Sequence, residues 1–510
     1  MRLISIWLAL GLALGLAACQ RAASPPENIP TAEIEWREGD VDDALAEAKE
    51  SGKPVMLYWG AKWCPPCNQM KSTLFKDAGF VAETRNFVPV YLDGDSEGAQ
   101  RWGERFGISG YPTVIILRAD GSEITCLSSA TTVSQLPEIL RVAATRTTPI
   151  ETLFAAAAKN PAALSRDEWR LLAAFDWQND PRHFSDPARA GALLDRLAAA
   201  APDGALERRF TLLALTINAK KGSDGQYRLD QTQQTRLLKI LPAILSNSEE
   251  VTANRLELSY SIPPLLAALP DVRRRGTLGA SLVTALDRVY GDEALPIPDR
   301  LGTVAADIAL AGAEGGPLPP AVREKVRARA AWADKAATDP MVRQSVISNA
   351  AALLHEAGDN AGAKRLLEAE LKRSASPYYY MLDLAGIAED EQDGPAAIGW
   401  ARKVHETAQG SATRVQWAIE YSKTVLRQAP DDKAAVEASA AAVIDELGKN
   451  PGSYYQRTRA KVSAWGSLIR QWSEAHDGAA ALGRLDARMV DVCARQGEEA
   501  ADCRRWAKAA

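Results

Sequence analysis

The sequence predicts an α/β domain followed by an all-α region of helical repeats. Between residues 34 and 147, short apolar and β-branched runs alternate with amphipathic helical segments, which is the pattern of an α/β fold around one sheet. From residue 148 onward, Ala- and Leu-rich segments of helical character are divided by Pro, Gly and Asp. After about residue 340 a spacing of 34 residues recurs, which indicates structural repeats.

The composition excludes several classes of protein. A chain of 510 residues is too long for one core, and 46% hydrophobic residues are enough to bury several. The 60 basic and 65 acidic residues include no strongly basic block, so nucleic acid is not expected as a partner. None of the four histidines stands beside a cysteine, so we expect no metal site. No organic cofactor is implied.

Residues 1–18 have the layout of an export signal. Arg2 precedes an apolar run that is shorter than a membrane-spanning helix requires. The run ends at Leu16-Ala17-Ala18-Cys19, which resembles the bacterial lipobox, where the cysteine is lipidated and becomes the mature N-terminus. An ordinary signal peptide with a chance cysteine is the alternative.

The lipobox resemblance implies a place in the cell envelope. Lipoproteins kept at the inner membrane usually carry Asp after the cysteine, whereas this chain has Gln20. We therefore expect a lipid anchor at Cys19 that faces the periplasm, with the outer membrane favoured. Residues 19–33, which contain several prolines, are expected to form an extended tether.

The elements of residues 34–147 follow from local signals. Asp40 can cap a helix that Gly52 ends, because Asp favours the start of a helix and Gly its end. Gly121 marks a hairpin turn between two β-branched runs. After a first edge strand at 34–36 and a helix at 40–51, the expected order is βαβαββα, with two consecutive helices in its first connection. Its strands are expected at 55–59, 87–92, 114–117 and 123–127, and its helices at 68–75, 77–84, 96–106 and 132–146.

Two cysteines lie at the turn between a predicted strand and a predicted helix. The segment Lys62-Trp63-Cys64-Pro65-Pro66-Cys67 joins the strand at 55–59 to the helix at 68–75. A Cys-x-x-Cys motif on a strand-to-helix turn is the setting of a redox dithiol. Half of a zinc knuckle is one alternative, although this domain has no second pair of cysteines and no suitable His. A purely structural disulfide is the other.

The domain resembles thioredoxin, and in particular the thioredoxin-like domains of bacterial periplasmic thiol:disulfide interchange proteins. Four motifs occur in the family's order: Gly52-Lys53-Pro54-Val55, Trp63-Cys64-Pro65-Pro66-Cys67, Tyr91-Leu92-Asp93 and Gly110-Tyr111-Pro112-Thr113. The resemblance implies a thiol:disulfide oxidoreductase that acts as a reductase or isomerase. Its substrates would be proteins with disulfides or thiols, and a redox partner would recycle its dithiol.

The site residues follow from this placement. Cys64, at a helix N-terminus, is the expected nucleophile, because unpaired N–H groups and the helix dipole favour its thiolate. Cys67, one helical turn further on, would resolve the mixed disulfide. The resemblance implies that Pro112 is a cis-proline against the dithiol and that Trp63 covers the site. Tyr111 would flank the substrate groove, and a packing role for it is equally expected.

Other positions depart from the family or stand outside the site. Thioredoxin has a buried aspartate six residues before the first cysteine, whereas this chain has Tyr58, so its proton route must differ. Cys126 is expected to be a buried thiol, and a reactive role for it stays open. Cys493 and Cys503 are expected to pair in an oxidising compartment, and two unlinked cysteines are the alternative.

The helical region divides into residues 148–340, read as diverged helical pairs, and residues 341–510, which resemble tetratricopeptide repeats. Ala363 and Ala397 are 34 residues apart, and so are Leu367 and Ala401. Such pairs stack into a curved array that can bind a peptide or protein. The aromatic residues of this region fit a concave binding surface less well than a core between helices; they are Tyr378, Tyr379, Tyr380, Trp400, Trp417, Tyr454 and Tyr455.

Two functions from different classes fit the sequence. The first is an exported, lipid-anchored thiol:disulfide oxidoreductase whose helical repeats position partners. The second is an envelope assembly or adaptor protein in which the repeats bind partners and the thioredoxin-like domain turns over little. More than two thirds of the chain carries no catalytic motif, which is the observation behind the second function.

Overall fold

The computed structural model describes residues 33–38, 40–108, 110–127, 136–145, 148–177, 182–184, 186–313, 315–410, 413–449, 454, 456–497 and 500–507. The predicted export signal, the lipidation site at Cys19, the tether up to residue 32 and Tyr455 lie outside these residues. Among the helices that the structure describes, none is both long and apolar enough to cross a bilayer.

A five-stranded mixed sheet forms the centre of the N-terminal domain. The strand order is β1-β3-β2-β4-β5; β1, β3 and β2 are parallel, while β4 and β5 are antiparallel to their neighbours. The central strand is buried along its whole length, which explains its continuous apolar sequence. The strands are β1 (Arg37–Glu38), β2 (Val55–Gly60), β3 (Val88–Asp93), β4 (Thr113–Leu117) and β5 (Glu123–Leu127).

Helices and a 3-10 turn connect and cover these strands. They are α1 (Val41–Ser51), α2 (Pro65–Ser72), η1 (Leu74–Lys76), α3 (Ala78–Thr84), α4 (Glu97–Arg105) and α5 (Leu136–Thr145). Asp40 caps α1 by accepting the N–H of Asp42, and Gly52 ends it at a φ of 71°. The order of elements is the predicted one. The first strand begins at Arg37 instead of Ile34, because Ile34 is buried in the core while pairing with β3 starts at Arg37.

The rest of the chain is mostly helical. Its first half contains α6 (Ile150–Lys159), η2 (Pro161–Ala163), α7 (Arg166–Ala174), α8 (Pro187–Ala200), α9 (Gly204–Asn218), β6 (Lys220–Lys221), β7 (Tyr227–Arg228), α10 (Gln231–Ser246), α11 (Ser248–Ala253), η3 (Glu257–Ser261), α12 (Ile262–Ala267), α13 (Val272–Gly291), α14 (Ile297–Gly302), α15 (Ala305–Gly312) and α16 (Pro320–Ala336). Its second half contains α17 (Pro340–Glu356), α18 (Asn360–Glu370), α19 (Tyr378–Asp390), α20 (Gly394–Thr407), α21 (Arg414–Gln428), α22 (Lys433–Lys449), α23 (Gln456–Ala475), α24 (Ala479–Cys493) and α25 (Ala500–Cys503).

The 34-residue spacing corresponds to two helices that begin in the same way. Asp359 caps α18 and Asp393 caps α20, each by accepting the backbone N–H three residues later. Inside the two helices, the small or apolar residues at equivalent positions are all buried: Ala363, Leu367, Ala397 and Ala401. Successive helices pack in pairs, α17 with α18, α19 with α20 and α21 with α22.

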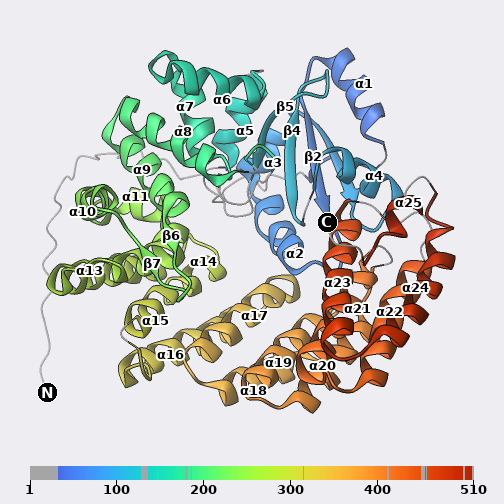
Figure 1. The fold of residues 1–510 in the computed structure, drawn as a ribbon. Coiled ribbons are helices and arrows are strands. Elements are labelled where there is room, and N and C mark those ends of the chain that lie inside the picture. Colours follow the sequence, from blue (N-terminus) through green and yellow to red (C-terminus); the bar gives the residue numbers. More distant parts are fainter. Residues whose placement is uncertain are drawn as a thin grey trace, which may run out of the picture.

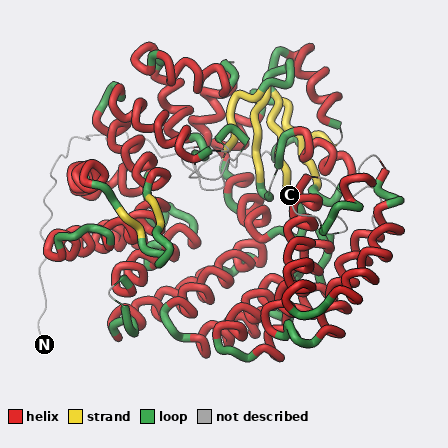
Figure 2. The backbone as a smooth tube through the Cα atoms, in the orientation of Figure 1, coloured by secondary structure: helices red, strands yellow, loops and turns green. Residues whose placement is uncertain are grey.

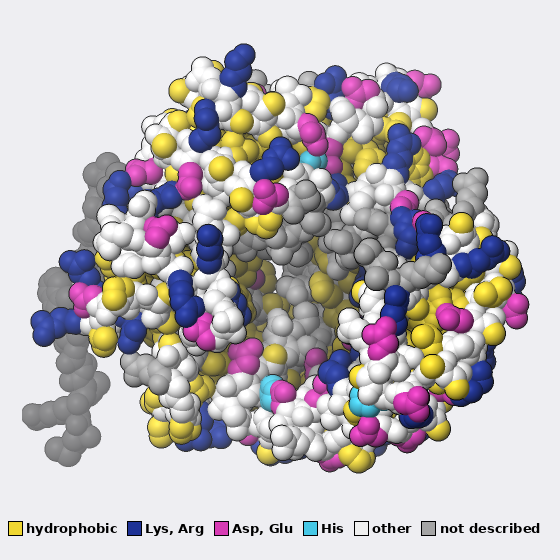
Figure 3. All heavy atoms as spheres, viewed as in Figure 1, with side chains coloured by type: hydrophobic (Ala, Val, Ile, Leu, Met, Phe, Trp, Pro, Cys, Tyr) yellow, Lys and Arg dark blue, Asp and Glu magenta, His cyan; other side chains and the backbone are white. Residues whose placement is uncertain are grey.

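The helices form an arc that leaves the α/β domain and returns to it. Figure 1 shows the arc passing from α6 through α13 and α16 to α18, and then back toward the sheet through α21 and α23. Figure 2 shows the five strands confined to one part of this ring. On return, α17 packs against α2 and α23 packs against α4. In Figure 3, basic and acidic side chains are interspersed around a hollow near the middle of the face shown.

Candidate active site at the Cys64–Cys67 turn

The two cysteines of the Cys-Pro-Pro-Cys motif form a disulfide at the N-terminus of α2. Cys64 is the N-cap residue, and its Sγ accepts the backbone N–H of Cys67 across 3.3 Å. Pro65 occupies the first turn, where a missing N–H costs nothing. In the reduced state, this N–H group and the helix dipole stabilise a thiolate on Cys64. The geometry therefore places Sγ of Cys64, and not that of Cys67, at the helix N-terminus, where a negative charge is stabilised.

A cis peptide bond between Tyr111 and Pro112 lies next to this turn. The bond immediately precedes β4, and Thr113 at the start of β4 pairs with Trp59 near the end of β2. The chain passes from β2 directly into the dithiol turn. Because Thr113 pairs with Trp59, the pairing of β2 with β4 brings Pro112 close to the turn that carries Cys64, although the two are far apart in the sequence.

Trp63 and Tyr111 border the disulfide and are held by polar contacts. The indole Nε1 of Trp63 donates a hydrogen bond to Asp95, in the turn after β3. The Tyr111 hydroxyl donates to the carbonyl of Gly94 across 3.2 Å and accepts from the Gln100 amide at the same distance. Burial raises the pKa of the Tyr111 phenol. Tyr111 is thus anchored toward the domain, as expected of a packing residue, while its ring faces Trp63 with centroids 6.2 Å apart.

The helical region lies directly over the disulfide. Cys64 is 2% exposed and Cys67 is fully buried. Together with Ala61 and Trp63 they form one apolar cluster with residues of α19, α20 and α21; these residues are Tyr378, Tyr379, Met381, Leu382, Val404, Ala408 and Trp417. Neither of the expected roles describes Tyr378, Tyr379 and Trp417 fully, because they share an apolar cluster with the two cysteines of another domain. Nothing local in the sequence identifies this contact.

Polar contacts join the same two parts around the apolar cluster. The Asn68 amide on α2 donates to Oε1 of Gln344 on α17 across 2.9 Å. Arg459 on α23 pairs with Glu104 on α4 at 2.7 Å. The Arg457 guanidinium lies over the Tyr111 ring, 5.1 Å from its centroid. The helical region therefore contacts three parts of the α/β domain: α2, α4 and the segment with the cis bond at Pro112.

Position 58, where thioredoxin has a buried aspartate, holds a fully buried tyrosine. Its ring packs against Trp36, Phe75 and Tyr91. Among the residues that the structure describes, its hydroxyl finds no hydrogen-bond partner. Burial holds the pKa of the Tyr58 phenol far above its usual value, so this group does not accept a proton near neutral pH.

One acidic side chain of the helical region titrates unusually. Burial raises the pKa of Asp383, on α19, to about 6. Ser348 lies on α17, one turn after Gln344, and its hydrogen bond to Asp383 lowers the pKa of that carboxyl and so opposes the effect of burial. The sequence places Asp383 in an ordinary helix, and only the packing of α19 against α17 makes it unusual.

The remaining cysteines lie outside the candidate site. Cys126 is buried on β5, opposite Ile115 of β4. Cys493 at the end of α24 forms a disulfide with Cys503 on α25, and both are fully buried in the core of the last helices. Among the described residues, no group of three or more His, Cys, Asp or Glu is placed to hold a metal ion.

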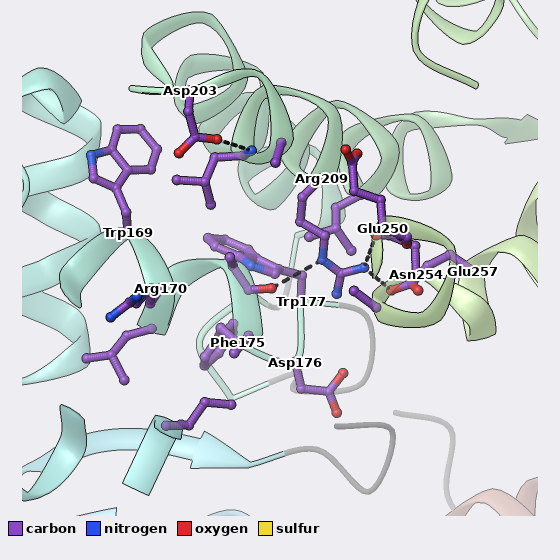
Figure 4. Close-up of a pocket in the computed structure, with 18 of the residues that line it drawn as sticks. Trp169, Arg170, Phe175, Asp176, Trp177, Asp203, Arg209, Glu250, Asn254 and Glu257 are labelled. Carbon is purple, nitrogen blue, oxygen red and sulfur yellow. Dashed lines mark hydrogen bonds and ion pairs between the residues drawn. The ribbon is translucent and has the colours of Figure 1, made fainter. Parts of the chain in front are cut away.

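A cavity lies between the α/β domain and the first helices of the helical region, and none of its described lining residues is a cysteine. It has a volume of about 1100 Å³ and aromatic walls formed by Trp169, Phe175 and Trp177 (Figure 4). Arg209 points into it and donates to Asn254 at 2.8 Å and to the Glu257 carboxylate at 2.7 Å. The guanidinium is thus neutralised by its own neighbours. No cysteine is among the described residues that line this cavity, so we assign the chemistry to the Cys64–Cys67 turn.

Comparison with known proteins supports this assignment. Residues 41–144 match the family model described as a thioredoxin-like domain. Over 86 residues the chain is 34% identical to the thiol:disulfide interchange protein DsbD of Ralstonia nicotianae, covering 16% of this chain and 14% of that protein. Over 125 residues it is 32% identical to thiol:disulfide interchange protein DsbD 1 of Pseudomonas aeruginosa, covering 23% and 21%.

The chain is also similar to a plant protein. Over 75 residues the chain is 31% identical to thioredoxin H4 of Arabidopsis thaliana, covering 15% of this chain and 60% of that protein. The chain thus spans about a seventh to a fifth of the two interchange proteins. The match to the family model lies within the α/β domain.

Proposed function

We propose that this protein, in which residues 41–144 form a thioredoxin-like domain followed by a mostly helical region, is a thiol:disulfide oxidoreductase acting on protein disulfides. The observation that carries the proposal is the Cys64–Cys67 pair at the N-terminus of α2, beside the cis bond at Pro112. The similarity to two thiol:disulfide interchange proteins supports it.

The proposed reaction moves two electrons from the dithiol to a substrate disulfide. The Cys64 thiolate attacks one substrate sulfur, so that a Cys64–substrate bond forms while the substrate S–S bond breaks and its other sulfur leaves and takes up a proton. Cys67 then loses its proton and attacks Sγ of Cys64. The second substrate thiol is released, and the Cys64–Cys67 disulfide forms again. A partner dithiol returns the pair to the reduced state, and no organic cofactor takes part.

The surroundings assign roles to the neighbouring groups. The N–H of Cys67 and the helix N-terminus stabilise the Cys64 thiolate as the attacking group. Tyr58 is unable to take the proton of Cys67, so water or another group accepts it. Trp63 and Pro112 would contact the substrate chain, and Tyr111 supports Trp63 from behind.

The finer parts of the proposal concern direction and place. We favour reduction or isomerisation of protein disulfides by an exported protein that is lipidated at Cys19 and faces the periplasm, with the outer membrane favoured. The lipobox resemblance supports the anchor. Growth of an expressing bacterium with radioactive palmitate tests it: label should enter the wild type and be lost in Cys19→Ser.

Turnover of insulin tests the activity itself. Reduced full-length protein, recycled by dithiothreitol, should accelerate the reduction of insulin disulfides, and Cys64→Ser should abolish the acceleration. The matched control is the Cys493→Ala/Cys503→Ala variant, which lacks the other disulfide and should turn over like the wild type. Equal rates with and without Cys64→Ser would refute the enzyme assignment if they are found both in the wild-type background and in Glu104→Arg, which breaks the ion pair with Arg459 of the helical region.

An adaptor is the second candidate, and the burial of the dithiol favours it. A Cys64 side chain only 2% exposed is a poor nucleophile toward a folded protein. In this case, the helical repeats would bind a peptide or protein and the thioredoxin-like domain would turn over little. Affinity purification of a Cys67→Ser variant separates the two candidates. Partners joined to Cys64 by mixed disulfides favour the enzyme, whereas partners retained without any disulfide favour the adaptor.

A further inference from the structure

The C-terminal helices occupy the face of the dithiol that a substrate has to reach. A substrate sulfur must touch Sγ of Cys64 for disulfide exchange, and this atom belongs to a side chain that is 2% exposed. Cys64 belongs to one apolar cluster with residues of α19, of α20 and its C-cap, and of α21; they are Tyr378, Tyr379, Met381, Leu382, Val404, Ala408 and Trp417. With the helices in this position, a protein disulfide has no access to Cys64.

The backbone at Gly410, after α20, lies so close to Trp63 that no side chain would fit at this position. A Cβ built on Gly410 would overlap Nε1 of Trp63 and would lie 2.8 Å from Oδ1 of Asp95. Asp95 accepts the hydrogen bond of this indole through its other oxygen, Oδ2. Gly410 also has a φ of 95°, which favours glycine. Glycine at this position therefore permits the cover to rest directly on the tryptophan of the dithiol motif.

The periphery of this contact is polar and partly unsatisfied, as in an interface that can separate. The Glu104–Arg459 ion pair and the Asn68–Gln344 hydrogen bond join the two parts. Within the described residues, Nε1 of Trp417 is buried without an acceptor, which weakens the closed arrangement. An interface with few polar ties and an unpaired buried donor is easier to open than a domain core.

We propose that α19, α20 and α21 form an internal cover that holds the dithiol inaccessible until the helical region moves away from α2 and α4. The consequence for turnover rests on the proposed function, whereas the covering of Cys64 does not. A partner that binds the helical arc more tightly in the open form than in the closed form would shift the equilibrium toward the open form. The size of the shift is set by the ratio of the two affinities. Access to Cys64 is thus decided by residues more than 300 positions away in the sequence.

Alkylation of the reduced full-length protein tests the cover directly. The rate at which a bulky maleimide modifies Cys64 is followed by mass spectrometry of the Cys64 peptide. The wild type should react slowly. Gly410→Val, which overlaps Trp63, and Glu104→Arg, which breaks the pair with Arg459, should each react at least about tenfold faster, because a larger share of molecules is open.

A charge swap and a distant reversal are the controls. Glu104→Arg/Arg459→Glu restores the ion pair and should return the rate toward that of the wild type. Arg484→Glu, which breaks a pair with Glu437 between α24 and α22, should leave the rate unchanged. If Gly410→Val does not fold, the charge pair alone carries the test. Modification of wild-type Cys64 as fast as in urea-unfolded protein would overturn the proposal. If alkylation is slow in the wild type and faster in the variants, the cover is supported. If in addition none of these proteins reduces insulin, the proposed function is refuted.

Discussion

The side-chain amide of Asn68 donates one hydrogen bond to the carbonyl of Lys62 and a second to Oε1 of Gln344, each across 2.9 Å. Asn68 immediately follows Cys67 on α2, and Gln344 lies on the first turns of α17. One buried amide group therefore links α2 to the residue that begins the cysteine turn, Lys62, and also to the helical region.

Loss of the amide at position 344 should loosen the helical region. In Gln344→Ala one donor of Asn68 stays buried without its partner, so the free energy of unfolding should fall by about 1–3 kcal/mol. Urea unfolding followed by tryptophan fluorescence measures the change. Gln231→Ala, which removes an exposed side chain from the start of α10, is the control and should change little. Identical midpoints for both variants would show that the bond contributes nothing.

The buried carboxyl of Asp383 should make stability depend on pH. Its pKa of about 6 in the folded state lies above the ordinary 3.8, so the folded protein keeps a proton that the unfolded chain releases between these values. Stability contributed by the protonated form is complete below pH 4 and is lost as the pH rises through 6. At pH 8 the ionised group then costs about 2–3 kcal/mol, from a shift of about two units at 1.4 kcal/mol each.

Asp383→Asn removes the ionisation and keeps an acceptor for Ser348. The variant should exceed the wild type in free energy of unfolding at pH 8, and the difference should shrink as the pH falls toward 4. Urea titrations at pH 8 and pH 4.5 measure the two differences. A gain that does not change with pH, or a loss at pH 8, would contradict the burial of this carboxyl.

The hydroxyl of Tyr58 should be dispensable. It is buried without a hydrogen-bond partner among the described residues, so Tyr58→Phe removes an unsatisfied group and should leave stability unchanged or raise it by up to about 1 kcal/mol. Insulin reduction should proceed at the wild-type rate, because the phenol does not accept the proton of Cys67. A drop in turnover at unchanged stability would assign Tyr58 a part in proton transfer.

The second disulfide should stabilise the C-terminal helices without serving catalysis. The Cys493–Cys503 bond closes a loop with a sequence separation of 10, which in the loop-entropy model contributes about 2–3 kcal/mol. Cys493→Ala/Cys503→Ala should therefore unfold at lower urea concentration than the wild type. Its redox titration at Cys64 and Cys67 should coincide with that of the wild type. A shifted titration would mean that the two disulfides communicate.

The α/β domain could be predicted well because each of its elements carries a local signal. Asp40 and Gly52 delimit α1, and the apolar run ahead of Cys64 gives the buried central strand. The helix starts at Asp359 and Asp393 could be predicted for the same reason, since capping depends on residues three positions apart. The first strand is displaced, because Ile34 marks core packing more than strand pairing.

The cover over the dithiol could not be predicted from the sequence. Trp417 and Tyr378 have the helical spacing of ordinary core residues, and their place in one cluster with Cys64 depends on the curvature that the whole arc accumulates. Small rotations at each helix pair add up along the arc and decide whether α19 lies near the two cysteines or far from them, and no single residue reveals that sum. The same holds for Asp383, whose pKa follows from packing between helices.

A redox titration of the full-length protein tests the central claim most directly. The protein is equilibrated in glutathione buffers of graded potential, quenched with acid and alkylated, and the state of each cysteine is measured by mass spectrometry. The account predicts a single two-electron transition in which Cys64 and Cys67 change together, in the range of about −270 to −120 mV spanned by thioredoxin-fold proteins that exchange disulfides. A Cys64–Cys67 pair that stays fully oxidised, or fully reduced, across that whole range would contradict it.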